Sequence, residues 1–139
     1  MSLDLHFFKK DVDFNELRRK INDLYDKHKA IKEEMESLED DYEESRLASH
    51  NVTHNLNKMA NAVGLYQVLW SPEEVGITTA SQMITPLEKA IKELVANPDK
   101  YKAYNPPNGW GNYDIFVSFC RSVLSTCEEN PDAIIEVSK

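Results

Sequence analysis

Two histidines in the polar stretch HNVTHN have the spacing of a metal site. His50 and His54 lie four residues apart, so both imidazoles could share one helical face and ligate zinc. His50, however, precedes Thr53, which the pattern makes the N-cap of the helix, and no third His or Cys lies nearby. Thr53 and Asn51 would then satisfy the first free amides of the helix without a ligand. We therefore predict a capping cluster that binds no metal, with His54 as a candidate ligand contact.

The stretch NPPNGWGN at residues 105–112 is the second place where a ligand could bind. Pro106 and Pro107 stiffen the backbone, and the glycines on either side of Trp110 permit a positive φ angle. Trp110 could stack on a planar ligand or anchor a partner protein, or it could cover the core as a lid. This loop and the stretch around Thr53 both precede predicted helices, whose N-termini favour anionic groups. The two stretches could therefore form a shared pocket.

The sequence predicts no reactive site at its two cysteines. Cys120 and Cys127 lie seven residues apart on one predicted helix, about 10 Å along its axis, which is too far for a disulfide. Both lie on the apolar face of that helix, where we expect inert core thiols. The sequence also lacks the glycine motifs of nucleotide-binding proteins and the signatures of zinc proteases and serine hydrolases. We expect no cofactor, and these residues give no support for an enzyme.

Composition limits the partners of the chain. Its 139 residues fit a single domain, and 16 Lys and Arg against 24 Asp and Glu give a net charge of -8. This charge disfavours binding to nucleic acid and favours basic partners. No window approaches the roughly 20 apolar residues of a membrane span, and the N-terminus lacks the pattern of a signal peptide. We predict a cytoplasmic protein that does not enter the membrane.

Alternating apolar residues at both ends of the chain predict strands. Residues 3–8 and 133–137 alternate in the manner of half-buried strands, and residues 45–52 could add a third strand. Apolar residues at helical spacing predict helices over about 53–63, 79–96 and 112–129. The fold class that we predict is α+β, with a small, mostly antiparallel three-stranded sheet packed by three to four helices. This single domain would comprise residues 1–12 and 46–139.

A long helix is predicted between the first two strands. Residues 13–45 contain no Gly or Pro, and Asp13 followed by Glu16 resembles a capping box. From Phe14 to Tyr42 apolar residues recur at alternating steps of three and four, which is the seam of a coiled coil. At about 48 Å this inserted helix is longer than a small domain can cover, so we predict that it projects and pairs with a second copy. The seam residues expected at the dimer interface are Leu17, Ile21, Leu24, His28, Ile31, Met35 and Leu38.

Charges beside the seam indicate how two copies of the helix would pair. In a parallel coiled coil Lys27 would face Lys32 of the other helix and Glu34 would face Glu39, so both contacts would be repulsive. In an antiparallel pair Lys27 would face Glu34, and the other charged pairs also become complementary. Each exposed pair contributes at most about 1 kcal/mol, so charge selects the orientation while the seam supplies the affinity. We predict an antiparallel homodimer; the alternative is that the helix folds back and the seam joins its own domain's core.

Four stretches of the chain resemble a family of small bacterial and phage proteins with no established activity. They are SLDL, NVTHNLNKMANAVGLYQVLWSPEEVGI, NPPNGWGNYD and PDAIIEVSK, and they follow the patterns N-(I/V)-T-H-N-L-x-x-M-A and N-P-x-N-G-W-G-x-Y. The resemblance covers residues 2–8 and about 49–139, whereas the long helix looks like an insertion. The resemblance implies no chemistry, but its motifs contain the candidate binding residues Asn51, Thr53, His54, Asn55, Asn108, Trp110 and Tyr113.

These expectations combine into one functional hypothesis and one alternative. The chain would be a non-enzymatic interaction or ligand-binding module that forms a homodimer through an antiparallel coiled coil. Its acidic character and the resemblance to phage proteins would suit an accessory protein that engages a host protein partner. The alternative is a small enzyme or small-molecule binder that uses His54 beside the Trp110 loop, because an imidazole can exchange a proton near neutral pH.

Overall fold

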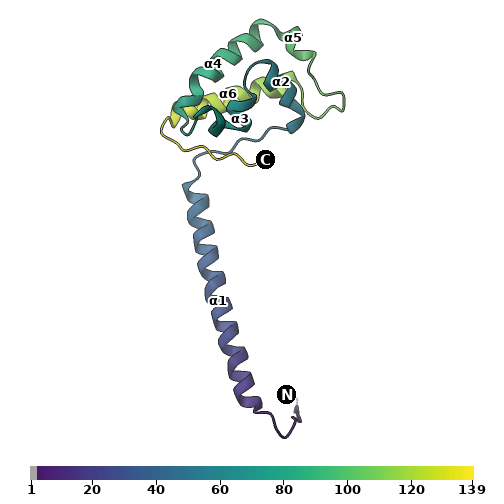
Figure 1. Ribbon diagram of the computed structural model, residues 1–139, viewed down its shortest axis with the longest axis vertical. Coiled ribbons are helices and arrows are strands. Elements are labelled where there is room, and N and C mark those ends of the chain that lie inside the picture. Colours follow the sequence, from purple (N-terminus) through teal and green to yellow (C-terminus); the bar gives the residue numbers. More distant parts are fainter. Residues whose placement is uncertain (1–2) are drawn as a thin grey trace. The chain divides into compact units, whose positions relative to one another are not determined.

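The computed structural model describes residues 3–139 and divides into two units. The first ends at Arg46 and contains helix α1 (Phe14–Ser45), whereas the second spans Leu47–Lys139 and contains the remaining helices (Figure 1). Residues 1–2, which the predicted domain includes, lie outside the described residues.

Capping residues mark both ends of helix α1. The Asp13 carboxylate accepts hydrogen bonds from the backbone N–H groups of Asn15 and Glu16, at 3.1 and 3.0 Å. At the other end, Arg46 leaves the helix in an extended conformation with a ψ angle of 116°. The helix predicted over residues 13–45 is therefore confirmed, with a length of 32 residues.

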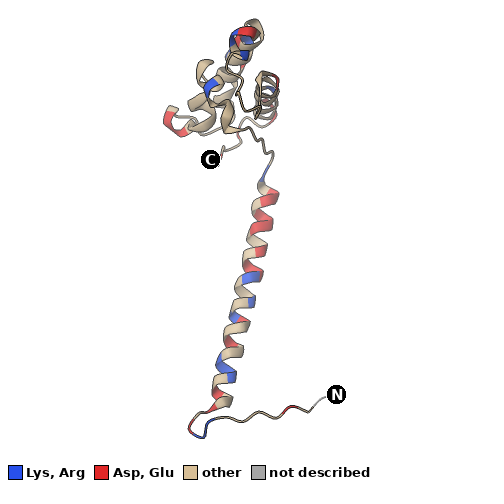
Figure 2. Cartoon of the chain, turned by 90° about the vertical axis from the view of Figure 1, so that its right-hand side faces the viewer, with Lys and Arg blue, Asp and Glu red and all other residues tan. Residues whose placement is uncertain are grey.

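The apolar seam of α1 is uncovered, because none of residues 14–45 is buried. Leu24 is 65% exposed, Phe14 is 36% exposed, and the other apolar seam side chains lie between these values. Figure 2 shows Lys and Arg mainly in the first half of α1 and Asp and Glu toward its C-terminal end. No helix within residues 3–139, α1 included, is both long and apolar enough to cross a membrane. The seam comprises Phe14, Leu17, Ile21, Leu24, His28, Ile31, Met35, Leu38 and Tyr42.

The unit Leu47–Lys139 is organised around two long helices, α4 (Ser81–Ala96) and α6 (Tyr113–Glu129), which pack against each other. Leu87 of α4 and Phe116 of α6 are fully buried in the core that the two helices share. The shorter helical segments of this unit are η1 (His54–Leu56), α2 (Asn57–Ala62), α3 (Tyr66–Trp70), η2 (Pro72–Val75) and α5 (Pro98–Lys102).

Prolines and a glycine help to set the limits of these helices. Pro72 and Pro98 occupy the first turns of η2 and α5, where the missing N–H group removes no helical hydrogen bond. Gly76 ends η2 in the left-handed conformation, with a φ angle of 74°. Pro86 lies inside α4, yet α4 continues as one helix, with buried residues on both sides of the proline.

The predicted α+β fold with a three-stranded sheet is wrong. Within residues 3–139 the structure contains no strand, and residues 3–8 and 45–52 are exposed or half-buried coil except where α1 ends. The C-terminal segment forms one isolated antiparallel bridge, between Thr79 and Ile134. Its alternating pattern has another cause: Ile134 is 87% exposed while its neighbours pack on the helical core. An extended segment that covers helices shows the same alternation as a strand, so the pattern alone does not establish a sheet.

The predicted grouping of residues 1–12 with residues 46–139 depended on that sheet. What holds the C-terminal segment instead is the start of α4. The Ala80 N–H donates to the Ala133 carbonyl at 2.9 Å, and the Ser81 N–H donates to the Pro131 carbonyl at the same distance. Backbone groups at the beginning of a helix have no partner within the helix, so they are available for such contacts.

Both cysteines lie in the core of the second unit, as the sequence predicts. Cys120 is fully buried and Cys127 is 3% exposed. Burial raises the pKa of the Cys120 thiol to about 12. The pKa of Cys127 is also raised, first by burial and then by the neighbouring Glu128 carboxylate. Neither thiol therefore has the lowered pKa of a reactive cysteine.

We predict that neither Cys120 nor Cys127 reacts readily with a chromogenic thiol reagent in the native protein at mildly alkaline pH. A raised pKa leaves little thiolate, which is the reactive form, and burial excludes the reagent. In denaturant both should react. The single variants Cys120→Ser and Cys127→Ser assign the two signals, and rapid labelling of either native thiol would contradict this core.

Candidate functional site

Thr53 is the N-cap of η1, as the sequence predicts. Its backbone is extended, with a φ angle of -66° and a ψ angle of 139°, and its hydroxyl accepts a hydrogen bond from the Asn55 N–H at 3.3 Å. The Asn55 side-chain amide donates to the same hydroxyl at 3.0 Å. Asn51, which was expected to share this role, is exposed. The capping acceptor is therefore the Thr53 hydroxyl, which receives both the backbone and the side-chain N–H of Asn55.

His54 has a structural partner that the sequence did not indicate. The Trp70 indole N–H donates to His54 Nδ1 at 2.9 Å, although the two residues are 16 positions apart. Trp70 is buried, and the ring of Tyr66 stacks on it with a centroid separation of 5.5 Å. Because Nδ1 accepts this bond, the neutral imidazole carries its proton on Nε2. His54 thus satisfies a buried donor and retains one N–H group for a ligand.

His50 contacts α6, whereas the partner of His54 belongs to α3. Its Nε2 atom forms a hydrogen bond of 2.7 Å with the Thr126 hydroxyl of α6, and its ring meets the Phe119 ring edge-on. His50 and His54 therefore serve separate contacts and do not form a pair of ligands. Within residues 3–139 no group of three His, Cys, Asp or Glu side chains is placed to hold a metal ion.

The loop between α5 and α6 is held by asparagine side chains. Asn105 Oδ1 accepts the Tyr113 N–H at 2.7 Å, and Asn108 Oδ1 accepts the Trp110 N–H at 3.0 Å. Asn112 caps α6 by accepting the Ile115 N–H at 2.9 Å. These short bonds from side chain to backbone fix the course of the loop without a regular element.

Trp110 is exposed to solvent, whereas Tyr113 is buried. Trp110 is 69% exposed, so it is not a lid over the core. Tyr113 is buried, and its hydroxyl donates to the Leu94 carbonyl at 2.7 Å, which joins α6 to α4. Tyr113 therefore supports the fold, whereas Trp110 is available to a partner.

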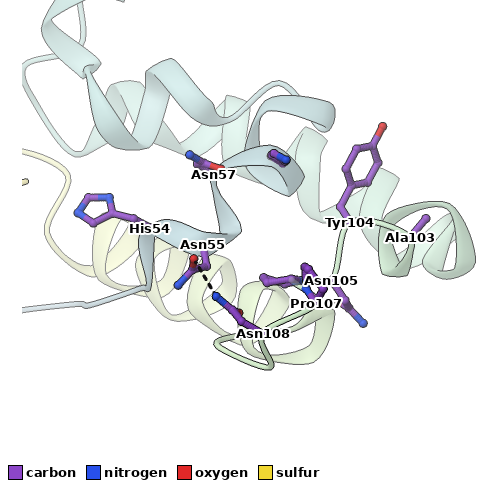
Figure 3. A pocket seen from close by; sticks show the side chains of 10 residues that line it. His54, Asn55, Asn57, Ala103, Tyr104, Asn105, Pro107 and Asn108 are labelled. Carbon is purple, nitrogen blue, oxygen red and sulfur yellow. Dashed lines mark hydrogen bonds between the residues drawn. The ribbon is translucent and has the colours of Figure 1, made fainter.

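The loop and the start of η1 converge in space. The Asn108 side-chain amide donates to Asn55 Oδ1 at 3.4 Å, a long hydrogen bond that spans 53 residues of sequence (Figure 3). Gly111 approaches even more closely: a Cβ atom at this position would lie 2.7 Å from Thr53 Cγ2 and 3.0 Å from Leu56 Cδ1. Its φ angle of 93° is also one that favours glycine.

Between these two segments lies an open hollow with a volume of about 470 Å³. Figure 3 shows Asn55 and Asn108 facing each other, with Tyr104 on one side of them and His54 on the other, its ring directed away from the two asparagines. Four asparagines and one lysine, but no carboxylate, line it, although the chain carries a net charge of -8. Trp110 is not among the lining residues, which are His54, Asn55, Asn57, Lys58, Ala103, Tyr104, Asn105, Pro106, Pro107 and Asn108.

The chemistry of this hollow is hydrogen bonding to a polar ligand. Side-chain amides both donate and accept, and the Lys58 ammonium and the His54 Nε2–H group only donate. The lining contains no Ser, Thr, Cys, Asp or Glu side chain. Sequence reasoning missed Asn57, Lys58 and Tyr104, because their place in the hollow depends on how the loop meets η1.

No protein-family model, curated protein or solved structure matches this chain. The resemblance to small bacterial and phage proteins therefore stays a prediction.

We predict that Gly111→Ala lowers the free energy of unfolding by more than about 2 kcal/mol. The methyl group would collide with Thr53, and the φ angle of 93° would add strain. Gly109→Ala is the matched control, because Gly109 has a similar φ angle of 76° but open space around its Cβ position. Denaturant unfolding followed by circular dichroism should show the larger loss for Gly111, and equal losses would contradict the close approach to Thr53.

We predict that His54→Leu lowers the free energy of unfolding by about 1–3 kcal/mol, because it leaves the Trp70 indole N–H without its acceptor. His54→Asn should retain most of the stability, since its side-chain oxygen can take the place of Nδ1. Denaturant unfolding again measures both variants. Equal stability of the leucine variant and the wild-type chain would mean that the Trp70 bond contributes nothing.

Proposed function

We propose that this chain is a non-enzymatic interaction module that forms a homodimer through an antiparallel coiled coil of α1. The observation that carries the proposal is the apolar seam of α1, which runs from Phe14 to Tyr42 without one buried residue. Burial of apolar surface contributes about 25 cal/mol per Å², and contiguous exposed apolar surface of this kind marks an interaction site. A second α1 offers the same seam at the same spacing.

An antiparallel arrangement centred between Lys29 and Ala30 matches the seam to itself. Ile21 then lies opposite Leu38 of the second copy, and Leu24 lies opposite Met35. His28 faces Ile31 near the centre, so the least apolar layers lie where the helices are least prone to fray. Each seam residue from Leu17 to Tyr42 thereby lies opposite a seam residue of the second copy.

The distribution of charge favours the same orientation. Residues 14–29 carry five Lys or Arg and three Asp or Glu, whereas residues 30–45 carry one Lys and eight Asp or Glu. A parallel dimer would set the two acidic halves side by side, and an antiparallel dimer sets each against a basic half. The last turn of α1 contains no basic residue, although Arg46 at the C-cap forms an ion pair with Glu43 at 3.1 Å, so a basic segment of a second helix would further stabilise this acidic end.

Individual pairs beside the seam agree with this orientation. Lys27 would face Glu34 of the second copy, and Arg18 would face Glu39. Lys20, which would face Asp41, already forms an ion pair of 3.3 Å with Glu16 in its own helix, so its contribution would be smaller. Such exposed pairs act mainly on orientation.

The unit Leu47–Lys139 supplies the surface that would meet another partner. Trp110 is 69% exposed on a loop that Asn108 and two glycines with positive φ hold in place. Exposed tryptophans on preorganised loops are frequent anchors of protein interfaces. A dimer would present two copies of this surface and would gain affinity for a repeated or dimeric partner. The resemblance to phage proteins and the acidic character suit a basic host protein in this role.

A second candidate function is a small enzyme or small-molecule binder that uses His54, and the amide-lined hollow is the observation that favours it. Binding fits the hollow better than proton abstraction, because His54 Nδ1 is occupied by the Trp70 N–H and the neutral ring offers a donor. Stray ligand in an experimental structure of the purified protein, bound between His54 and Asn105, would bring this function forward.

We predict that the wild-type chain has the solution mass of a dimer and that Lys27→Glu weakens the dimer. The substitution sets the introduced carboxylate of each variant copy against Glu34 of the other, which produces two repulsive contacts. Adding Glu34→Lys should restore the affinity, because the pair is then complementary with its charges exchanged. Light scattering at several protein concentrations measures all three chains.

The matched control for this prediction is Lys29→Glu, which makes the same change of charge at a position that faces away from the seam. It should weaken the dimer less than Lys27→Glu does. A monomeric wild-type chain would overturn the antiparallel dimer. So would a double variant whose dimer is no more stable than that of Lys27→Glu alone.

A further inference from the structure

An aromatic pair lies at the start of α1. The chain turns ahead of the helix, where the Val12 N–H donates to the Lys9 carbonyl at 3.3 Å. Phe8 thereby stacks on Phe14, the first residue of the seam, with ring centroids 4.3 Å apart and planes 7° apart. The two side chains are still 52% and 36% exposed, so the pair offers open apolar surface. Phe7, by contrast, is 93% exposed.

At the other end of the seam, a small residue lies beside the last aromatic one. Three residues after Tyr42, where the heptad spacing puts the next residue on the same face of α1, lies Ser45, a small residue whose hydroxyl donates to the Tyr42 carbonyl at 2.7 Å and thus remains close to its own helix. The Tyr42 ring is 49% exposed, with the Arg46 guanidinium 5.3 Å from its centroid. A large apolar group from a second helix would fill the space beside Ser45 and cover part of Tyr42.

We propose that Phe8 and Phe14 of one copy pack on Ser45 and Tyr42 of a second copy, and we call this contact the end clasp. The inference rests on the proposed antiparallel dimer. With its centre between Lys29 and Ala30, that dimer sets Phe14 opposite Ser45, large against small. Phe8, which is stacked on Phe14, adds a second ring to the same layer. The two-fold symmetry produces one end clasp at each end of the coiled coil.

The end clasp is a contact that one chain cannot make with itself along α1. Phe14 and Tyr42 are 28 residues apart on one helix, which separates them by about 42 Å. Energetic coupling between Phe8 and Tyr42 would therefore come from a second copy. This property separates the end clasp from a local role of Phe8 in starting the helix.

The first test is Phe8→Ser in the full chain, with the dimer dissociation constant measured by sedimentation equilibrium. We expect it to rise about tenfold, because the variant removes one aromatic contact at each end of the dimer. Phe7→Ser is the matched control and should leave the constant unchanged. Circular dichroism of the dissociated chains should show equal helix content, which excludes a local effect on α1. An unchanged constant for Phe8→Ser would overturn the end clasp.

The second test combines Phe8→Ser with Tyr42→Ser. Because both residues belong to one contact, the double variant should weaken the dimer by clearly less than the product of the two single effects. Multiplicative effects would overturn the end clasp and leave the coiled coil standing. A wild-type chain that remains monomeric at every concentration would overturn both the end clasp and the proposed function, so the two failures are distinguishable.

Discussion

The need to bury apolar surface governs both units of this chain, and they meet it differently. In Leu47–Lys139 the apolar faces of α4 and α6 close on each other around residues such as Leu87 and Phe116, with the shorter helices adding to the same core. In α1 an equally regular apolar face remains exposed from Phe14 to Tyr42. The first arrangement supports a folded unit, and the second is the basis of the proposed dimer. The two halves of α1 also differ in charge, because residues 14–29 carry more basic than acidic residues and residues 30–45 carry mostly acidic ones, which favours an antiparallel orientation in that proposed dimer.

The candidate binding surface depends on one close approach in the folded unit. Gly111 lies so near Thr53 and Leu56 that a side chain would not fit, and this approach brings the Asn-rich loop to the start of η1. The hollow lined by His54, Asn105 and the neighbouring amides exists because these segments meet. Trp110, at the end of the same loop, is left exposed. The glycine therefore connects the packing of the core with the polar surface above it.

Sequence reasoning succeeded where a signal is local. The cap at Asp13, the absence of helix breakers up to Ser45 and the cap at Thr53 are properties of neighbouring residues, and the structure contains each of the helices that they start. It failed at the sheet. The alternation of residues 133–137 predicts a strand, but it reflects an extended segment held by the start of α4. A strand needs a second strand as a partner, and whether one is present is not a local property.

The sequence by itself determined the helices near residues 13–45, 53–63, 79–96 and 112–129, the apolar seam of α1 and the acidic composition, because capping, periodicity and charge depend on residues that are close together in the chain. It also marked His54 and the Trp110 loop as unusual. Only the tertiary structure decided that the Trp70 indole occupies His54 Nδ1, that Asn108 meets Asn55, and that Trp110 remains exposed. These contacts join residues 16 and 53 positions apart. Such pairs are selected by the packing of the whole core, for which the spacing of residues along the chain carries no direct signal.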